Sequence, residues 1–220
     1  MPRRLIDLSH VIKDGMVTYP GLPTPTVSEH LTREAAVSIY GPDVTFTMGM
    51  VTMCSNTGTY LDVPYHRYID GHDLTGLALD RVADVPGVCV RRVDQTAIDL
   101  PRLGELDLEG CAVLICTGHS EKFGTDSYFV DHPHLTASTA RALVDANVAC
   151  VGIDSLNIDS TAAGNGRPVH SILLKAGIPI IEHLTNLDQV PRGGFRFSAV
   201  PPKIERMGTF TVRAYASVPA

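Results

Sequence analysis

The stretch "LTASTARALVDANVACVGID" (residues 135–154) decides the fold class. Alanine, leucine and valine recur at helical spacing over 135–147, and the Thr136 side chain can cap the start of that helix. The apolar run at 149–154 follows at once and predicts a buried strand. The chain repeats this unit at 168–184, where Pro168 opens a helix, Gly177 follows its end and "IPIIEHL" supplies the next strand.

β-rich segments surround these two helix–strand units. The alternating "VTFTMGMVTMC" at 44–54 predicts a half-buried strand, because one face of such a strand is apolar. Buried strands are also expected at 87–93 and 112–118, with further strands at 4–12, 24–31, 195–204 and 209–216. Strands therefore outnumber helices, and the sequence predicts an α/β fold with a mixed, partly barrel-like sheet. No internal repeat or linker is visible, so one domain is expected over residues 1–220.

Composition narrows the class of protein. The 220 residues carry a net charge of −6, which argues against a nucleic acid or an anionic membrane as partner, since either requires clustered lysine and arginine. The N-terminus has no apolar signal segment, and no apolar run reaches the length of a membrane span. Five cysteines without a CxxC spacing are expected to be buried reduced thiols, with Cys54 as the one alternative catalytic candidate. These features favour the cytoplasm as the location of the protein.

Four ligand-type side chains follow apolar segments at separate points of the chain: Asp62, His66, His170 and Glu182. Glu182 is the most informative, because it follows three isoleucines in a run that should be interior. An ionised carboxylate is costly there unless it is paired or bound to a cation. Two carboxylates and two imidazoles form a ligand set used for Zn²⁺ or Mn²⁺. The other histidines have no spacing partner and are expected to be structural or solvated: His10, His30, His72, His119, His132, His134 and His183.

The segment "TGTYLDVPYHR" (57–67) carries the first two of these ligand-type residues. In an extended backbone, Tyr60 and Asp62 point to the same side, because side chains alternate along a strand. Pro64 then fixes the turn that presents His66.

The chain resembles the bacterial cyclase family that contains kynurenine formamidase and isatin hydrolase. The resemblance covers nearly the whole sequence and includes "IDLSHVI", "TYPG" (18–21), "VGIDSLNID", "PVHSILL" and "IPIIEHLTNLDQVP". The family motif is HxGTHxDxPxH, and this chain has "NTGTYLDVPYH" (56–66) in its place, with Asn56 and Tyr60 where the family has histidines. The resemblance implies a swivelling β/β/α domain that assembles as a homodimer or tetramer.

The resemblance also implies residue roles. Asp62, His170 and Glu182 match metal ligands of the formamidases, and His66 matches the catalytic proton donor and acceptor. The loss of two imidazoles leaves three alternatives open: one divalent ion (zinc or manganese), none, or two. Without a metal, Asp62 and Glu182 would share a proton, because two close carboxylates cannot both stay ionised cheaply. Tyr19 matches an aromatic residue of the substrate pocket. Substrate contacts or altered metal positions are expected at Tyr19, Asn56, Tyr60 and Ser155.

Three functions remain open from the sequence. In the first, the protein is an amide hydrolase acting on an aryl formamide or a cyclic amide, with an ion that activates water and with His66 as the proton carrier. In the second, it is a cyclase or lactonase that acts on a small keto acid or polyketide. In the third, it is a binding protein with an inactive site. A small molecule is the expected partner in the first two.

Overall fold

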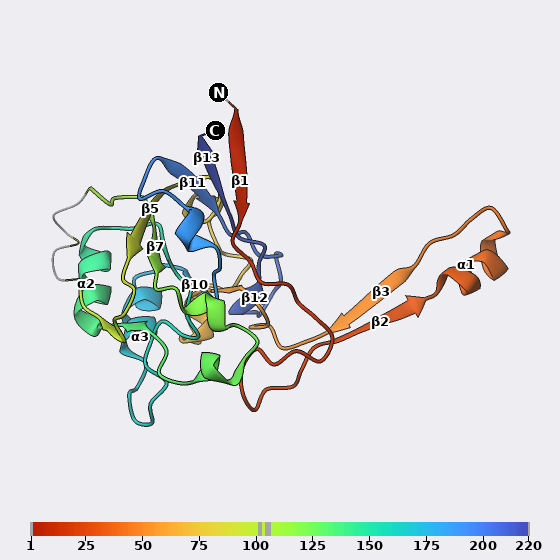
Figure 1. Ribbon diagram of the computed structural model, residues 1–220, viewed down its shortest axis with the longest axis horizontal. Helices are drawn as coiled ribbons and strands as arrows, with labels where there is room; N and C mark the ends of the chain where they lie inside the picture. Colours follow the sequence, from red (N-terminus) through yellow and green to blue (C-terminus); the bar gives the residue numbers. More distant parts are fainter. Residues whose placement is uncertain (1, 101–102, 104–106, 220) are drawn as a thin grey trace.

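The computed structural model describes residues 2–100, 103 and 107–219. Its main element is a nine-stranded sheet in the order β1-β13-β11-β5-β7-β9-β10-β4-β12 (Figure 1). The strands are β1 (Arg3–Asp7), β4 (Tyr60–Asp62), β5 (Val85–Arg91), β7 (Ala112–Cys116), β9 (Cys150–Ile153), β10 (Ile180–Glu182), β11 (Phe195–Ser198), β12 (Thr209–Thr211) and β13 (Tyr215–Pro219).

The centre of this sheet is parallel and its two sides are antiparallel. Strands β5, β7, β9 and β10 run parallel to one another. Antiparallel strands extend the sheet on one side through β11, β13 and β1, and on the other through β4 and β12. The sheet curls strongly across its width, which confirms the expected α/β fold with a mixed, partly barrel-like sheet.

Helices α2 (Ala137–Asp145) and α3 (Pro168–Lys175) form as their sequences predict. The Thr136 side chain accepts from the backbone N–H of Thr139 at the start of α2, and Pro168 stands in the first turn of α3. Both helices pack on one face of the sheet, where Val113, Val151 and Ile180 point toward them. The intervening residues Leu114, Cys150 and Ile181 point to the opposite face and join a second core, as period-two alternation requires.

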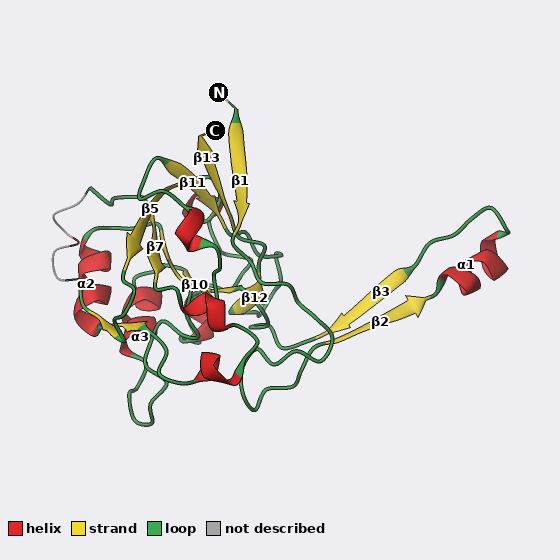
Figure 2. Cartoon of the chain, in the orientation of Figure 1, coloured by secondary structure: helices red, strands yellow, loops and turns green. Residues whose placement is uncertain are grey.

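An arm made of β2 (Thr26–Leu31), α1 (Arg33–Tyr40) and β3 (Met48–Thr52) projects away from the body of the molecule (Figures 1 and 2). Strands β2 and β3 pair only with each other. The prediction of a half-buried strand over 44–54 was wrong, because β3 is shorter and every residue of it is exposed. The alternation is present, but no second layer of the described residues covers its apolar side. Helix α1 was not expected from the sequence.

The remaining elements are short. They are the two-residue strands β6 (Ala97–Ile98) and β8 (His134–Leu135), and the 3₁₀ turns η1 (Pro64–His66), η2 (Leu79–Arg81), η4 (His119–Lys122), η5 (Asp126–Phe129) and η6 (Leu187–Gln189). The predicted strand over 209–216 is two strands, β12 and β13, which pair with different neighbours. Within the described residues, no helix combines the length and the apolar character needed to cross a membrane. One domain over 1–220 stays a prediction, although the pairing of β1 with β13 joins the two ends of the chain.

Candidate functional site

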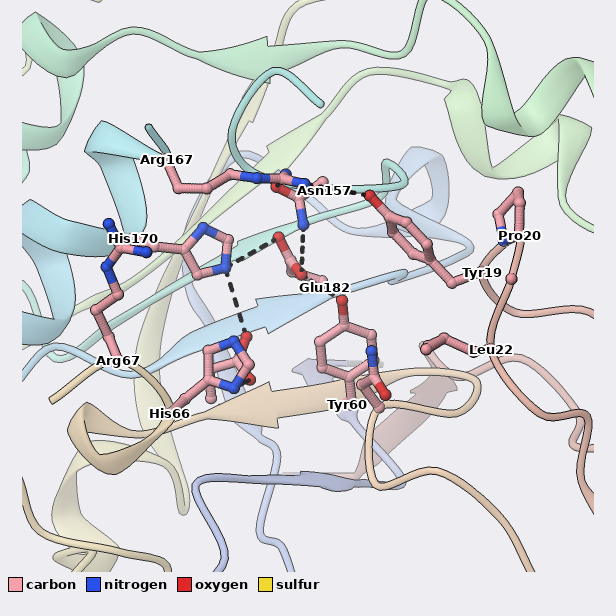
Figure 3. A pocket seen from close by; sticks show the side chains of 13 residues that line it. Tyr19, Pro20, Leu22, Tyr60, His66, Arg67, Asn157, Arg167, His170 and Glu182 are labelled. Atoms are coloured by element: carbon pink, nitrogen blue, oxygen red, sulfur yellow. Dashed lines mark hydrogen bonds and ion pairs between the residues drawn. The ribbon is translucent and has the colours of Figure 1, made fainter. Parts of the chain in front are cut away.

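A cavity of about 470 Å³ opens where β4 and β10 lie beside the N-terminal end of α3 (Figure 3). The register of the β4–β10 pair sets Tyr60 opposite Glu182 and Asp62 opposite Ile180. Directly opposed residues share a face, so both carboxylates point to the side of the sheet that α3 covers. The cavity is lined by Tyr19, Pro20, Gly21, Leu22, Asn56, Tyr60, Asp62, His66, Arg67, Asn157, Arg167, His170 and Glu182.

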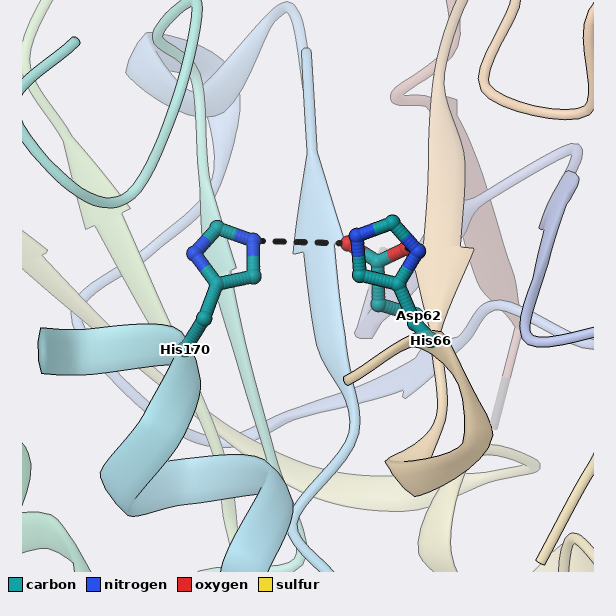
Figure 4. Close-up of side chains that lie close together, drawn as sticks. All are labelled: Asp62, His66 and His170. Carbon is teal, nitrogen blue, oxygen red and sulfur yellow. Dashed lines mark ion pairs between the residues drawn. The ribbon is translucent and has the colours of Figure 1, made fainter. Parts of the chain in front are cut away.

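The Asp62 carboxylate is buried and has one oxygen without a hydrogen-bond partner. Its Oδ1 accepts from the hydroxyl of Thr209, which stands opposite it in the β4–β12 pair. Its Oδ2 is completely buried and accepts a hydrogen bond from none of the described residues. Oδ2 lies 3.6 Å from His170 Nε2, and a dashed line marks this pair in Figure 4. A buried carboxylate oxygen without a donor is costly, and a cation at this position would satisfy it.

His170 is held so that one ring nitrogen faces Asp62. The Asp159 carboxylate accepts from the backbone N–H groups of Val169 and His170 in the first turn of α3. The same carboxylate binds His170 Nδ1 at 2.7 Å. Because Nδ1 donates to this acceptor, Nε2 is the nitrogen presented to the cavity. A carboxylate behind an imidazole in this way is the usual support of a metal-binding histidine.

Glu182 is also buried, and its two oxygens have different partners. Oε2 accepts from the hydroxyl of Tyr60 and from Asn157 Nδ2 at 3.3 Å. Oε1 accepts from the backbone N–H of Ile158 at 2.5 Å and lies 3.7 Å from His170 Nε2. Glu182 is therefore an interior carboxylate, as its place after three isoleucines predicts.

The pKa values reflect an excess of buried negative charge. Burial raises the pKa of Glu182 to about 7, with His170 opposing the shift. Burial would lower the pKa of His170, but Glu182, Asp159 and Asp62 outweigh it and raise this pKa to about 10. Burial also raises the pKa of Tyr60 well above its usual range, and the nearby carboxylates add to the effect. Tyr60 is therefore a neutral donor at this site rather than an anionic ligand.

His66 lies at the edge of the cavity, with its side chain 43% exposed. The Thr209 hydroxyl is 2.7 Å from His66 Nδ1 and donates its single proton to Asp62. Thr209 therefore accepts from Nδ1–H, which leaves the lone pair of a neutral His66 on Nε2. Thr209 thus fixes the tautomer of His66 as well as holding Asp62.

The donor set fits one divalent ion. Within the described residues, ligand atoms of Asp62, His66 and His170 lie within 4.8 Å of one another. The set predicted from the sequence has Glu182 in place of His66. Both residues offer an atom to such a set: His66 keeps Nε2 free, and Glu182 Oε1 lies 3.7 Å from His170 Nε2 while it also accepts from the Ile158 N–H. A second ion beside Glu182 fits poorly, since the Tyr60 hydroxyl and Asn157 already occupy Oε2.

The structure brings together seven of the eight residues singled out from the sequence. Tyr19 and Asn56 line the cavity with the four ligand-type residues and Tyr60. Ser155 does not line it: the side chain is completely buried, and its hydroxyl has no hydrogen-bond partner. The sequence alone gave no role to five further residues at or beside the site: Asn157, Asp159, Arg67, Arg167 and Thr209. No local pattern connects Thr209 to Asp62, because only the sheet register joins them.

The chain therefore combines an α/β fold with a candidate metal site. The family model described as "Putative cyclase" matches residues 6–160, and the chain belongs to this cyclase family. It is 28% identical over 210 residues to the kynurenine formamidase of Bacillus cytotoxicus, with 95% of each chain covered. It is 26% identical to the kynurenine formamidase of Paracidovorax citrulli, with 100% of this chain and 99% of the relative covered.

Solved structures share the fold over the full chain. One is described as a potential metal-dependent hydrolase with cyclase activity, with a TM-score of 0.79, 25% identity and complete coverage of both chains. Another is an isatin hydrolase bound to the product analogue thioisatinate, with a TM-score of 0.81, 21% identity and coverage of 99% of this chain and 93% of that one. The isatin hydrolase likeness supports the fold, and the expected family resemblance is confirmed.

Proposed function

We propose that the protein is a metal-assisted hydrolase of a small aryl formamide or cyclic amide. The observation that carries the proposal is the unpartnered Asp62 Oδ2 facing His170 Nε2 in an open cavity. The kynurenine formamidase and isatin hydrolase names of the relatives support amide hydrolysis. Tyr19 and Leu22 give the same cavity an apolar wall against which a flat ring can pack.

Asp62, His170 and Glu182 would hold one divalent ion, zinc or manganese, because two carboxylates and one imidazole suit either metal. A bound divalent ion supplies Lewis acidity, which lowers the pKa of water and stabilises negative charge on a carbonyl oxygen. His66 would move the proton: its Nε2 accepts from the attacking water and returns the proton to the leaving nitrogen. Thr209 would keep Nε2 as the basic nitrogen throughout, through its contact with Nδ1.

The first experiment is elemental analysis of the purified protein after dialysis, followed by assays with aryl formamides, cyclic imides and lactones. We expect about one zinc or manganese per chain and hydrolysis of an amide substrate that stops on chelation. Hydrolysis confined to lactones would favour the cyclase or lactonase function instead. A folded protein with no metal and no hydrolysis would overturn the proposal and favour a binding protein.

We also propose that the protein is a homo-oligomer that self-associates through the arm. The arm exposes large apolar side chains that no other part of the described chain covers, among them Ile39 (64% exposed), Tyr40 (56%) and Met50 (52%). It spans residues 26–52, about the 20–30 residues that one partner contributes to a standard interface. A second copy of the chain is the partner that would cover them.

The cytoplasm is the proposed location. All five cysteines are free, and Cys89, Cys116 and Cys150 are buried in strands. Reduced thiols of this kind suit a reducing compartment.

A further inference from the structure

His183 is a completely buried histidine that directly follows Glu182, and no step of the proposed reaction uses it. Its backbone has a φ of 56°, in the left-handed region that a residue with a side chain adopts at a cost. Such strain persists only where the surrounding contacts hold the residue in place. The contacts of His183 therefore show what its conformation achieves.

The backbone of His183 joins the two strands beside β10. Its N–H donates to the carbonyl of Ser155, just beyond the end of β9, at 3.3 Å. Its carbonyl accepts from the hydroxyl of Thr59, the residue before β4, at 2.5 Å. Strand β10 lies between β9 and β4 in the sheet. His183 thus fixes the end of β10, where Glu182 stands, to both neighbouring strands.

The ring of His183 holds the backbone that supplies donors to Glu182. Its Nε2 lies 2.8 Å from the carbonyl of Leu156 and donates to it, since a carbonyl can only accept. The next two residues along the chain both donate to Glu182. Asn157 Nδ2 donates to Oε2, as a dashed line in Figure 3 marks, and the Ile158 N–H donates to Oε1. An anchor on Leu156 therefore controls where both donors lie relative to the carboxylate.

Three buried polar atoms at and around His183 lack a hydrogen-bond partner among the described residues. Because Nε2 carries the proton of the neutral ring, Nδ1 presents a lone pair, and no group donates to it. The Tyr128 hydroxyl, in η5, is also without a partner, and the Tyr128 and His183 ring centroids are 5.5 Å apart. The third atom is the hydroxyl of Ser155. Of the five buried atoms of this kind in the described residues, three therefore belong to His183 and two of its neighbours.

These three atoms match the bonding of a single water molecule. A water can donate to His183 Nδ1, accept from the Tyr128 hydroxyl and do either with the Ser155 hydroxyl. Buried waters typically form about three hydrogen bonds to polar groups that would otherwise be unsatisfied. Burial raises the pKa of Tyr128 well above its usual range, and the charges of Asp154 and Glu182 add to this effect. Because the phenol keeps its proton, it is a donor to water and a weak ligand for a metal ion.

We propose that one buried water molecule binds between Ser155, Tyr128 and His183, and that this water holds His183 as the positioning residue of Glu182. With the water on Nδ1, the ring proton stays on Nε2 and the contact with Leu156 is kept. Ser155 then supports the site from behind the carboxylate rather than from inside the cavity. The water site is independent of any metal. Its consequence for metal binding rests on the proposed function, in which Glu182 is a ligand.

A crystal structure at a resolution that orders internal water tests the water site. In the wild type we expect one water within about 2.7–3.2 Å of all three side chains. In Tyr128→Phe, crystallised in the same form, this water should be lost, because one of its three partners is missing. A wild-type structure in which the three groups bond directly to one another, without water, would overturn the site.

Two variants of His183 separate its two ring contacts. Glutamine places its amide nitrogen near the position of Nε2 and can keep the bond to Leu156. Asparagine places its amide oxygen near the position of Nδ1 and can keep only the bond to the water. Hydrogen exchange of the Ile158 amide, measured in the metal-free protein, should become about 5- to 10-fold faster in His183→Asn, the effect of one lost hydrogen bond on local opening. It should change little in His183→Gln.

Backbone strain alone predicts the opposite order, because asparagine tolerates a positive φ better than glutamine does. Equal or reversed exchange rates in the two variants would therefore overturn the positioning role. His134→Asn is the matched control. The Nδ1 atom of His134 also lies near a backbone carbonyl, that of His132 at 3.2 Å, but in β8, outside the main sheet. This variant should leave the exchange of the Ile158 amide unchanged.

Zinc binding separates this inference from the proposed function. If both hold, Kd for zinc should rise about 10- to 100-fold in His183→Asn, the usual cost of losing a group that orients a metal ligand, and change little in His183→Gln. A protein that binds no zinc but has the water and the expected order of exchange rates would sustain the inference and refute the metal site. Equal zinc affinity and equal exchange in the two variants would sustain the metal site and refute the positioning role.

Discussion

The Tyr60 hydroxyl donates a hydrogen bond to Glu182 Oε2, across a sheet pair in which the two residues stand directly opposite each other. They are 122 positions apart in the chain. In the motif HxGTHxDxPxH, which residues 56–66 resemble, a histidine stands at the position of Tyr60. Tyr60 therefore places a neutral phenol where the motif has an imidazole. Its hydroxyl gives the buried Glu182 carboxylate a hydrogen-bond donor that does not depend on a metal.

Tyr60→Phe should destabilise the metal-free protein by about 1–3 kcal/mol, because it removes a donor from a buried charged acceptor. Tyr68→Phe is the matched control, since the Tyr68 hydroxyl donates to a neutral backbone carbonyl of Ser171 at 2.8 Å. Urea unfolding of both variants measures the difference. An equal loss in the two variants would contradict the special role of the Tyr60–Glu182 contact.

Restoring both family histidines with Asn56→His and Tyr60→His should increase the zinc bound per chain. The change frees Glu182 Oε2 from the Tyr60 hydroxyl and supplies two imidazoles, which zinc prefers to neutral oxygen donors. Elemental analysis of the folded double variant checks it. Unchanged zinc content would mean that other groups limit the site, with Asn157 as the next to test because it also contacts Oε2.

His66→Ala and Glu182→Ala should have different effects. His66→Ala should lower turnover about 10²–10⁴-fold and leave metal content unchanged, because His66 carries protons in the proposed scheme. Glu182→Ala should remove the metal, since the site loses a direct ligand and a compensating charge; Glu182→Gln covers the case in which alanine prevents folding. His30→Ala, exposed on the arm, is the control. The assigned roles fail if His66→Ala empties the site while Glu182→Ala leaves it full.

Acid should destabilise the protein between pH 6.5 and 4 through three buried histidines, and Glu182 offsets part of this effect, because its pKa of about 7 lets the folded chain bind one proton that the unfolded chain does not. Burial lowers the pKa of His10 and His132 to about 4 and that of His183 to about 3. The unfolded chain therefore binds more protons below pH 6.5, so the free energy of unfolding falls as pH drops from 6.5 toward 4. His132→Gln can keep the contact with Thr161. It should reduce the slope of the unfolding free energy against pH by up to the contribution of about one proton. Urea unfolding between pH 5 and 8 measures this slope for the wild type and the variant. An unchanged slope in His132→Gln would contradict a neutral buried His132.

A charge on the arm should dissociate the oligomer. Met50→Glu combined with Tyr40→Glu places two carboxylates on the exposed apolar side chains of the arm. We expect sedimentation to show a shift from oligomer to monomer with the fold retained. Ile69→Glu is the control, because Ile69 is 92% exposed outside the arm. A wild-type protein that is already monomeric, or an oligomer that survives the double change, would refute the arm as the interface.

The local sequence was enough to predict those features that depend only on residues near them in the chain. Thr136 and Pro168 mark two helix starts because a cap and a fixed φ act within one turn. Glu182 marks the site because a carboxylate after three isoleucines has few stable environments in a folded protein. Alternation over 44–54 predicted a strand but misjudged its burial, since exposure depends on what else the fold brings near.

The sequence by itself determined the α/β class, the helix–strand units and the residue types proposed to hold a cation, because these follow from periodicity, capping and the cost of buried charge. Only the tertiary structure decided their partners. Sheet register set Tyr60 against Glu182 and Thr209 against Asp62, and helix placement turned His170 toward both carboxylates. It also gathered Arg67 and Arg167 at one cavity. Most of these contacts join residues more than a hundred positions apart, and hydrogen bonding acts over about 3 Å in space whatever the separation along the chain.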